Sequence, residues 1–166
     1  MQNPGNLSKF WRNLIIPITF LAVVIGDIIT KDWIRTFPAD GQTITKIGFL
    51  RIIHITNTGS AFGAFQGYAL VLAIIGILGL FLLAGLGIFV YKKYPMLVTI
   101  PNRIALGLIL GGDLGNLIDR FRFSGHVTDF IDPGFFPVFN VADSAITIGV
   151  ILVIFAVLRE MMHENK

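Results

Sequence analysis

The sequence predicts an integral membrane bundle of four transmembrane helices, with a small extracytoplasmic β-sheet between the first and second helices. Composition is the first reason, because 54% of the 166 residues are hydrophobic, 14% are charged and the mean hydropathy is +0.77. A soluble domain of this size could not bury so much apolar surface. The second reason is four apolar stretches that reach or approach the ~20 residues needed to cross a ~30 Å hydrocarbon core. They lie at 14–31, 69–91, 104–118 and 142–158.

The segments outside these stretches are too short for a separate soluble domain, so we expect residues 1–166 to form one membrane-embedded domain. The net charge of +3 is small and scattered, which excludes nucleic acid as a partner. The absence of cysteine excludes a thiol nucleophile and a disulfide framework. Lys9 and Arg12 precede the first stretch, as in a signal peptide, but no small-residue cleavage site follows. We therefore expect an uncleaved first helix.

Basic residues near the helix ends indicate the orientation, because they favour the cytoplasmic side of a membrane. Seven Lys and Arg residues fall on the side that we assign to the cytoplasm, and the other six fall on the opposite side. The seven are Lys9, Arg12, Lys92, Lys93, Arg103, Arg159 and Lys166. All Asp residues fall towards the opposite side, and the only acidic residues on the cytoplasmic side are Glu160 and Glu164. We expect both termini in the cytoplasm and the polar chemistry at the extracytoplasmic face.

The segment between the first two apolar stretches is the only sizeable extramembrane piece. From Gln42 to Asn57 it is rich in Ile and Thr, and apolar and polar residues partly alternate. This pattern predicts two short strands joined near Gly48, lying on the outer leaflet.

Small residues recur at helical spacing in the last two apolar stretches. Gly107, Gly111 and Gly115 form one stripe, and Ala145 and Gly149 form another. Such stripes let membrane helices approach closely, so we interpret them as packing surfaces.

Asp129 and Asp143 bracket a short loop between the last two apolar stretches. Carboxylates beside a bilayer are costly, so a pair of them suggests chemistry: one can take a proton from water while the other supplies one. Simpler interpretations remain open for each residue. Asn140 and Asp143 have the spacing of an N-cap and an N3 acid, and Asp129 could be a solvated loop acid. Asp27 and Lys31 have the i, i+4 spacing of an ion pair.

Other functional classes have weaker support. His54, His126 and His163 are dispersed, so even His126 with Asp129 lacks the ligands of a metal site, and we expect no metal and no cofactor. The alternative to an enzyme is a small membrane transport or channel subunit that uses the two Asp residues for protons or cations. The cytoplasmic halves of the helices are nearly devoid of polar groups, which argues against such a path.

Five motifs occur in order along nearly the whole chain, and together they resemble those of the lipoprotein signal peptidase family, also called signal peptidase II. The motifs are Asp27–Lys31, Asn57–Phe62, Gly111–Arg120, Val127–Phe130 and Phe139–Ser144. The resemblance implies a membrane aspartic endopeptidase that cuts bacterial prolipoproteins before a diacylglyceryl-modified cysteine.

The resemblance also implies the roles of individual residues. Asp129 and Asp143 would be the catalytic pair. Residues that bind substrate or support the site would be Asn57, Gly59, Asn116, Arg120, Asn140, Asp27 and Lys31. The enzyme would work as a monomer in the bacterial cytoplasmic membrane, with lipid-modified prolipoprotein signal peptides and membrane lipids as its partners.

Three features depart from the family pattern: Ile28, Asp113 and the short loop 131–137. Asp113 is the most consequential, because it shares a helix face with Asn116 and Arg120. An ionised, unpaired carboxylate inside the bundle would be costly. We expect Asp113 to be neutral, hydrated or paired, with Lys31 and Arg120 as the candidate partners.

Overall fold

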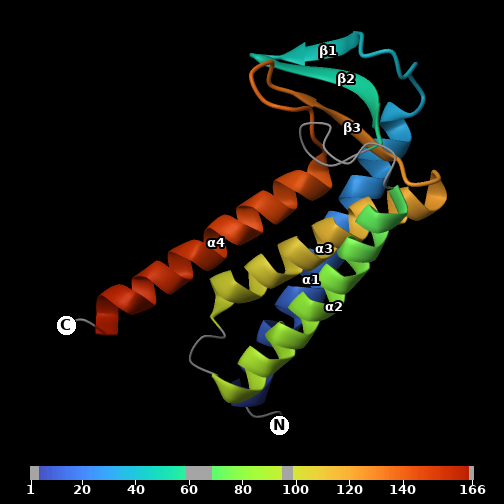
Figure 1. Cartoon of the computed structure of the whole chain (residues 1–166). Coiled ribbons are helices and arrows are strands. Elements are labelled where there is room, and N and C mark those ends of the chain that lie inside the picture. The colour runs from blue at the N-terminus through green and yellow to red at the C-terminus, as the bar shows by residue number, and fades with distance from the viewer. Residues whose placement is uncertain (1–3, 59–68, 95–98, 165–166) are drawn as a thin grey trace.

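The computed structural model describes residues 4–58, 69–94 and 99–164, which contain the four expected helices and a small sheet (Figure 1). The helices are α1 (Pro4–Ile34), α2 (Ala69–Lys93), α3 (Ile100–Arg122) and α4 (Val141–Glu164). Each runs beyond the apolar stretch that predicted it, because the helix continues into the polar residues that flank the stretch. Over the described residues, three helices are long and apolar enough to cross a membrane, at Trp11–Ile34, Val71–Lys93 and Val141–Arg159. A fourth crossing, by α3, stays a prediction.

The sheet has three antiparallel strands in the order β1-β2-β3. Strands β1 (Thr43–Ile47) and β2 (Leu50–Asn57) form the predicted hairpin, and Gly48 in its turn has φ +62°, a value that favours glycine. The third strand, β3 (Val127–Asp132), was not predicted, and residues 131–132 belong to it rather than to the expected loop. Five of its six residues are buried, so it lacks the alternation that identified the hairpin.

Helix α3 lies at the centre of the bundle, and its glycine stripe makes the close approach that the sequence predicts. A Cβ atom on Gly111 would lie 2.9 Å from the Phe20 carbonyl oxygen of α1, and one on Gly115 would lie 2.6 Å from the Asp27 carboxylate. On the other side of α3, a Cβ on Gly149 of α4 would lie 2.9 Å from the Ala105 carbonyl oxygen. Because these helices approach so closely, α3 cannot slide along its axis relative to α1 and α4 without steric clashes.

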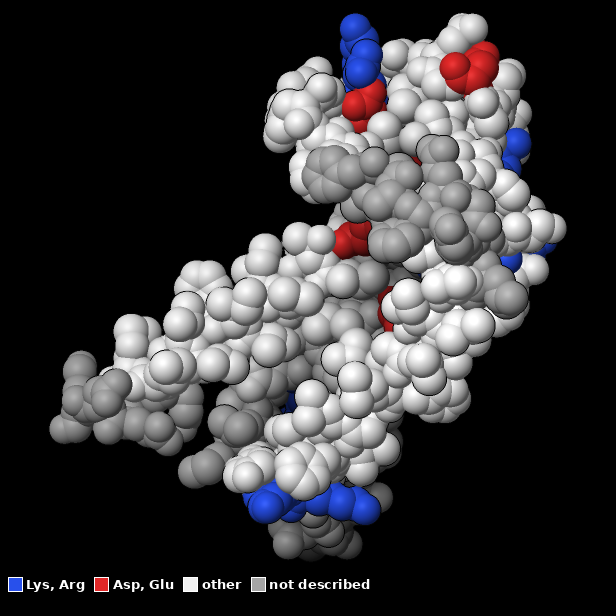
Figure 2. All heavy atoms as spheres, viewed as in Figure 1, with Lys and Arg blue, Asp and Glu red and all other residues white. Residues whose placement is uncertain are grey.

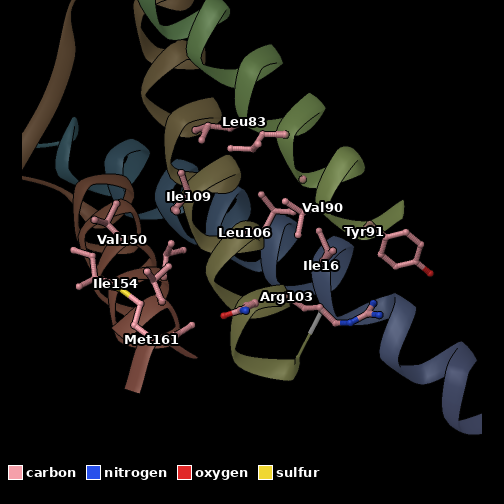
Figure 3. A pocket seen from close by; sticks show the side chains of 16 residues that line it. Ile16, Leu83, Val90, Tyr91, Arg103, Leu106, Ile109, Val150, Ile154 and Met161 are labelled. Atoms are coloured by element: carbon pink, nitrogen blue, oxygen red, sulfur yellow. The ribbon is translucent and has the colours of Figure 1, made fainter. Parts of the chain in front are cut away.

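The sheet covers one end of the bundle, and the chain termini lie at the other end (Figure 1). Figure 2 shows basic side chains both at the end away from the sheet and at the end that carries it. An apolar cavity of about 610 Å³ lies between α2, α3 and α4 in the half away from the sheet (Figure 3). Its walls include Leu83, Leu106, Ile109 and Ile154. The acidic residues singled out by the sequence lie in the other half, beneath the sheet.

Candidate active site

Asp129 lies on β3, where the strand passes over the ends of the helices. Its side chain is 2% exposed, so it is not the solvated loop acid of the simpler interpretation. Two side-chain amides donate to its carboxylate: Asn57 Nδ2 to Oδ2 at 2.8 Å and Asn140 Nδ2 to Oδ1 at 2.7 Å. Asn57 comes from β2, the neighbouring strand, and Asn140 immediately precedes α4. Three separate elements therefore define the position of one carboxyl group.

Asp143 lies in the first turn of α4 and takes part in a capping box. Its backbone N–H donates to Asn140 Oδ1 at 3.0 Å, and the Asn140 N–H donates to Asp143 Oδ2 at 3.2 Å. The capping interpretation of this residue is confirmed. The other carboxylate oxygen is held from α3, because Asn116 Nδ2 donates to Asp143 Oδ1 at 2.7 Å.

Asn140 links the two acids directly. It is 0% exposed, and its side-chain amide bonds to Asp129 through Nδ2 while its carbonyl oxygen caps the helix at Asp143. The same Nδ2 also lies 3.1 Å from Asn116 Oδ1. Asp129 and Asp143 therefore belong to one hydrogen-bonded unit, although they come from different elements.

The surroundings of Asp129 favour its protonated form. Burial is the largest influence and, together with the charge of Asp143, it raises the pKa of Asp129 to about 7. The hydrogen bonds from Asn57 and Asn140 and the positive charge of Lys31 lower this pKa but do not cancel the burial. Near neutral pH, Asp129 holds a proton for a substantial part of the time. Two acids coupled in this way titrate as a pair.

Lys31 and Asp27 form the predicted ion pair, with Lys31 Nζ 2.7 Å from Asp27 Oδ2. The pair is not at the surface, because both side chains are 0% exposed. Lys31 Nζ also donates to Asn116 Oδ1 at 2.9 Å and lies 3.7 Å from Asp119 Oδ2. Asp27 Oδ1 accepts the Ala142 N–H at 2.9 Å, which ties α1 to the first turn of α4. The pair thus supports the unit that holds Asp143.

Arg120, on the last turn of α3, supplies positive charge to the site. Its positive charge interacts with the carboxyl groups of Asp143, Asp113, Asp129 and Asp119. Its Nε is buried and has no hydrogen-bond partner among the described residues. Gly59, the remaining predicted site residue, lies outside the described residues.

No group of three or more His, Cys, Asp or Glu side chains in the described part of the chain is arranged to hold a metal ion. Two of the histidines instead bond to backbone carbonyl oxygens through Nδ1, His54 to Phe37 and His126 to Phe123, each at 2.7 Å.

Comparisons with known proteins agree with this arrangement. A family profile described as "Signal peptidase (SPase) II" matches residues 19–159. The chain is 46% identical to the lipoprotein signal peptidase of Dehalococcoides mccartyi over 84% of this chain and 86% of that protein. It is 37% identical to the lipoprotein signal peptidase of Syntrophomonas wolfei over 95% and 98% of the two chains. This chain belongs to the signal peptidase II family.

A solved structure of a bacterial membrane enzyme has the same fold as this member of the signal peptidase II family. The TM-score is 0.76 at 37% identity, covering 87% of each chain. A second structure described in the same words has a TM-score of 0.71 at 38% identity, covering 85% of this chain and 90% of the other.

In this signal peptidase II family member, the structure brings together eight of the nine site residues named from sequence. It adds three that were not named as site residues: Arg35, Thr128 and Asp119. Asp119 appeared in the sequence only as a member of the motif Gly111–Arg120. Thr128 appeared only as a member of the motif Val127–Phe130. Arg35 lies outside the motifs, and its bond to Thr128 joins residues 93 positions apart in the chain.

Asp113 does not join the expected network with Lys31, whose charged partners among the described residues are Asp27 and Asp119. Asp113 is half-buried and faces α2, where its carboxylate oxygens approach Gly76 and Gly79. Arg120, the other candidate, is the cation that acts on it. Two glycines on α2 leave room for this carboxyl group, which explains how the bundle accommodates it.

We expect Asp113→Ala to retain cleavage within about tenfold of the parent enzyme, because Asp113 makes no hydrogen bond to either acid of the pair and its loss weakens only a Coulombic contact with Arg120. The measurement is the initial rate of prolipoprotein cleavage by purified enzyme in detergent. A loss as large as that from Asp129→Asn, in protein that remains folded, would show that Asp113 belongs to the catalytic pair.

Proposed function

We propose that this chain is a membrane aspartic endopeptidase that removes the signal peptide from bacterial prolipoproteins, cleaving before the diacylglyceryl-modified cysteine. One observation carries the proposal: Asp129 and Asp143 are joined through the single side-chain amide of Asn140. Burial, together with the charge of Asp143, raises the pKa of Asp129 to about 7. Such a pair can hold one proton and one negative charge at the same time. Membership of the signal peptidase II family supports the substrate class and does not support the transport alternative.

The two acids then have different roles. Asp143, ionised, takes a proton from a water molecule, and the water oxygen attacks the carbonyl carbon of the residue before the cysteine. Asp129, protonated, donates its proton to the carbonyl oxygen, and a tetrahedral diol forms. Asp143 then gives the proton that it took from water to the cysteine nitrogen, and Asp129 takes a proton back from a hydroxyl of the diol. The C–N bond breaks, and the products are the signal peptide with a C-terminal carboxyl group and a free cysteine amine. We assign the base to Asp143 because the N-terminus of α4 favours its ionised form, the form that can accept a proton.

The remaining residues bind substrate or hold the acids in place. Arg120 Nε, buried and without a partner among the described residues, is placed to bind a substrate carbonyl. Asn57, Asn116 and Asn140 hold the carboxylates, and Asp27 and Lys31 support Asn116 and the start of α4. Gly59 keeps its predicted role in substrate binding. No step requires a metal or an organic cofactor.

The site fits a substrate held at the surface of the membrane. The acids lie between the helix ends and the sheet, and the diacylglyceryl group would anchor the cysteine at the same depth as the outer headgroups. We propose that all four helices cross the bacterial cytoplasmic membrane as one domain, with the sheet outside, and that the chain acts as a monomer surrounded by lipid.

The direct test is a gel-shift assay with a lipidated prolipoprotein and purified enzyme. We expect a mobility shift that corresponds to loss of the signal peptide, and a new N-terminal cysteine by mass spectrometry. The matched control is the same prolipoprotein without the diacylglyceryl group, which should be cut far more slowly. Equal cleavage of both substrates, or cleavage at another bond, would contradict the proposal.

The orientation has its own test, because the chain contains no cysteine and single cysteines can be introduced without background. Gln42 and Lys93 are both exposed but lie at opposite ends of the bundle. We expect Gln42→Cys to react with an impermeant thiol reagent in spheroplasts and Lys93→Cys to react only after lysis. The opposite pattern would place the acids on the cytoplasmic side.

A further inference from the structure

A second charged cluster lies behind Asp129 and joins the ends of α1 and α3 to β3. Its centre is Asp119, on the last turn of α3, which is 2% exposed. Arg35 forms an ion pair with it, with Nη2 2.5 Å from Asp119 Oδ1. The other carboxylate oxygen, Oδ2, accepts the backbone N–H of Thr128 at 3.0 Å. One buried carboxylate therefore binds both a cation and the backbone of the strand that carries Asp129.

Arg35 completes this cluster, because it also bonds to Thr128, the residue of β3 that Asp119 holds. Its Nε donates to Thr128 Oγ1 at 3.0 Å, and its guanidinium lies over the Phe123 ring, 4.0 Å from the centroid. A planar guanidinium that bonds along its edge and stacks on its face is held in one orientation. Thr128 is thus held by its backbone from Asp119 and by its side chain from Arg35.

Thr128 immediately precedes Asp129 on β3, and successive side chains on a strand point to opposite faces. Asp129 meets Asn57 and Asn140 on one face, and Thr128 meets Arg35 on the other. The Arg35–Asp119 pair therefore braces the strand from behind, at the residue next to the acid.

The partner acid is held from the same helix. Asn116 of α3 donates to Asp143 Oδ1 at 2.7 Å, and Asp119 follows three residues later on the same face. At a rise of ~1.5 Å per residue, the two anchoring side chains are separated by about 4.5 Å along a rigid helix. The spacing between Asp129 and Asp143 is therefore tied to α3 at both ends.

We propose that Arg35 is a positioning residue of the peptidase: through Asp119 and Thr128 it holds Asp129 in its position relative to Asp143. This inference rests on the proposed aspartic mechanism. Without Arg35, Asp119 loses its shortest ion pair and Thr128 loses a hydrogen bond, while Asn57 and Asn140 still hold the Asp129 carboxylate itself. The strand can then shift, and a misplacement of about 1 Å at a reacting group costs on the order of 100-fold in rate.

The test separates turnover from substrate binding. We expect Arg35→Ala to lower kcat by about 10- to 100-fold with KM changed by less than about threefold, because Arg35 contacts Asp119, Thr128 and Phe123 and neither acid of the pair. Arg35→Lys keeps the charge opposite Asp119 but loses the planar edge, so its kcat should fall between those of the parent and Arg35→Ala.

Thr128 provides a milder pair of variants in case Arg35→Ala does not fold. Thr128→Val keeps the shape of the side chain and the backbone N–H but removes the acceptor for Arg35 Nε, and we expect kcat to fall by about three- to tenfold. Thr128→Ser keeps the hydroxyl, so its kcat should stay within about twofold of that of the parent. A general loss of packing would affect Ser at least as much as Val, so this order of activities is specific to the hydrogen bond.

Arg51→Ala is the matched control. Arg51 also forms an ion pair with β3, through Asp132 at 2.5 Å, but at the end of the strand away from Thr128. We expect its kcat to match that of the parent. Normal kcat in Arg35→Ala, or equal activity in Thr128→Val and Thr128→Ser, would overturn the inference. If Asp129→Asn itself retained full activity, the proposed mechanism would fail instead, so the two failures are distinguishable.

Discussion

Asp129→Asn and Asp143→Asn, made one at a time, are each expected to reduce kcat by at least ~10²- to 10⁴-fold, the usual contribution of a group that transfers a proton in the transition state. The amide cannot take a proton from water, and it cannot supply one to the carbonyl oxygen. Because the two acids act as a unit, the double variant should be little slower than either single variant. The shape of each side chain is kept, so the protein should still fold.

The measurement is single-turnover cleavage of a lipidated prolipoprotein, together with size-exclusion chromatography to show that each variant is folded. Asp132→Asn is the matched control, since Asp132 is also a buried acid on β3 but pairs with Arg51 and not with the site. It should cleave at a rate close to that of the parent. Turnover near the parent rate in either Asp129→Asn or Asp143→Asn would remove that residue from the catalytic pair.

Lys31→Met is expected to give the largest loss of stability, about 3–5 kcal/mol, because removing one partner of a buried ion pair leaves an uncompensated charge. Lys31 is 0% exposed, and its loss leaves Asp27 with no cation within ion-pair distance among the described residues. Asp119 loses its second cation, and Asn116 loses a donor to its carbonyl oxygen. The damage therefore spreads to the residue that holds Asp143.

The free energy of unfolding can be followed by denaturant titration in detergent, using tryptophan fluorescence. Lys46→Met is the control, because Lys46 is exposed on β1 and should change stability by less than about 0.5 kcal/mol. A double variant, Lys31→Met with Asp27→Leu, should recover part of the loss, because it removes both members of the pair. Parent-like stability in Lys31→Met would mean that water reaches the pair and solvates Asp27.

Local patterns in the sequence predicted most of the fold. The helices follow from apolar length, the hairpin from alternation around Gly48, and the close packing of α3 from glycines four residues apart. Strand β3 was missed because it is buried along most of its length and includes two acids, so it has neither the alternation nor the apolar run of a strand. Its pairing with β2 and its backbone bridge to Phe139 stabilise it as a strand.

In the site, too, contacts between residues close in the sequence were predicted and contacts between distant residues were not. The Asp27–Lys31 pair and the Asn140–Asp143 cap join residues three or four positions apart, and both were predicted. The bond from Lys31 to Asn116 spans 85 positions, and the bond from Arg35 to Thr128 spans 93. No spacing rule connects residues so far apart. Family motifs identified Lys31 and Asn116 as site residues, while Arg35 lies outside those motifs and was found only from the structure.

Asn140 has a consequence for how this enzyme can be engineered or can diverge. Helix starts are common targets for stabilisation, and Ser, Thr or Asp at position 140 would cap α4 about as well as Asn does. None of them offers both a carbonyl oxygen to the helix and an NH₂ group to Asp129. A library selected for thermal stability alone would accept these replacements and yield robust but inactive protein. Selection for turnover would keep Asn, so position 140 separates the two kinds of screen.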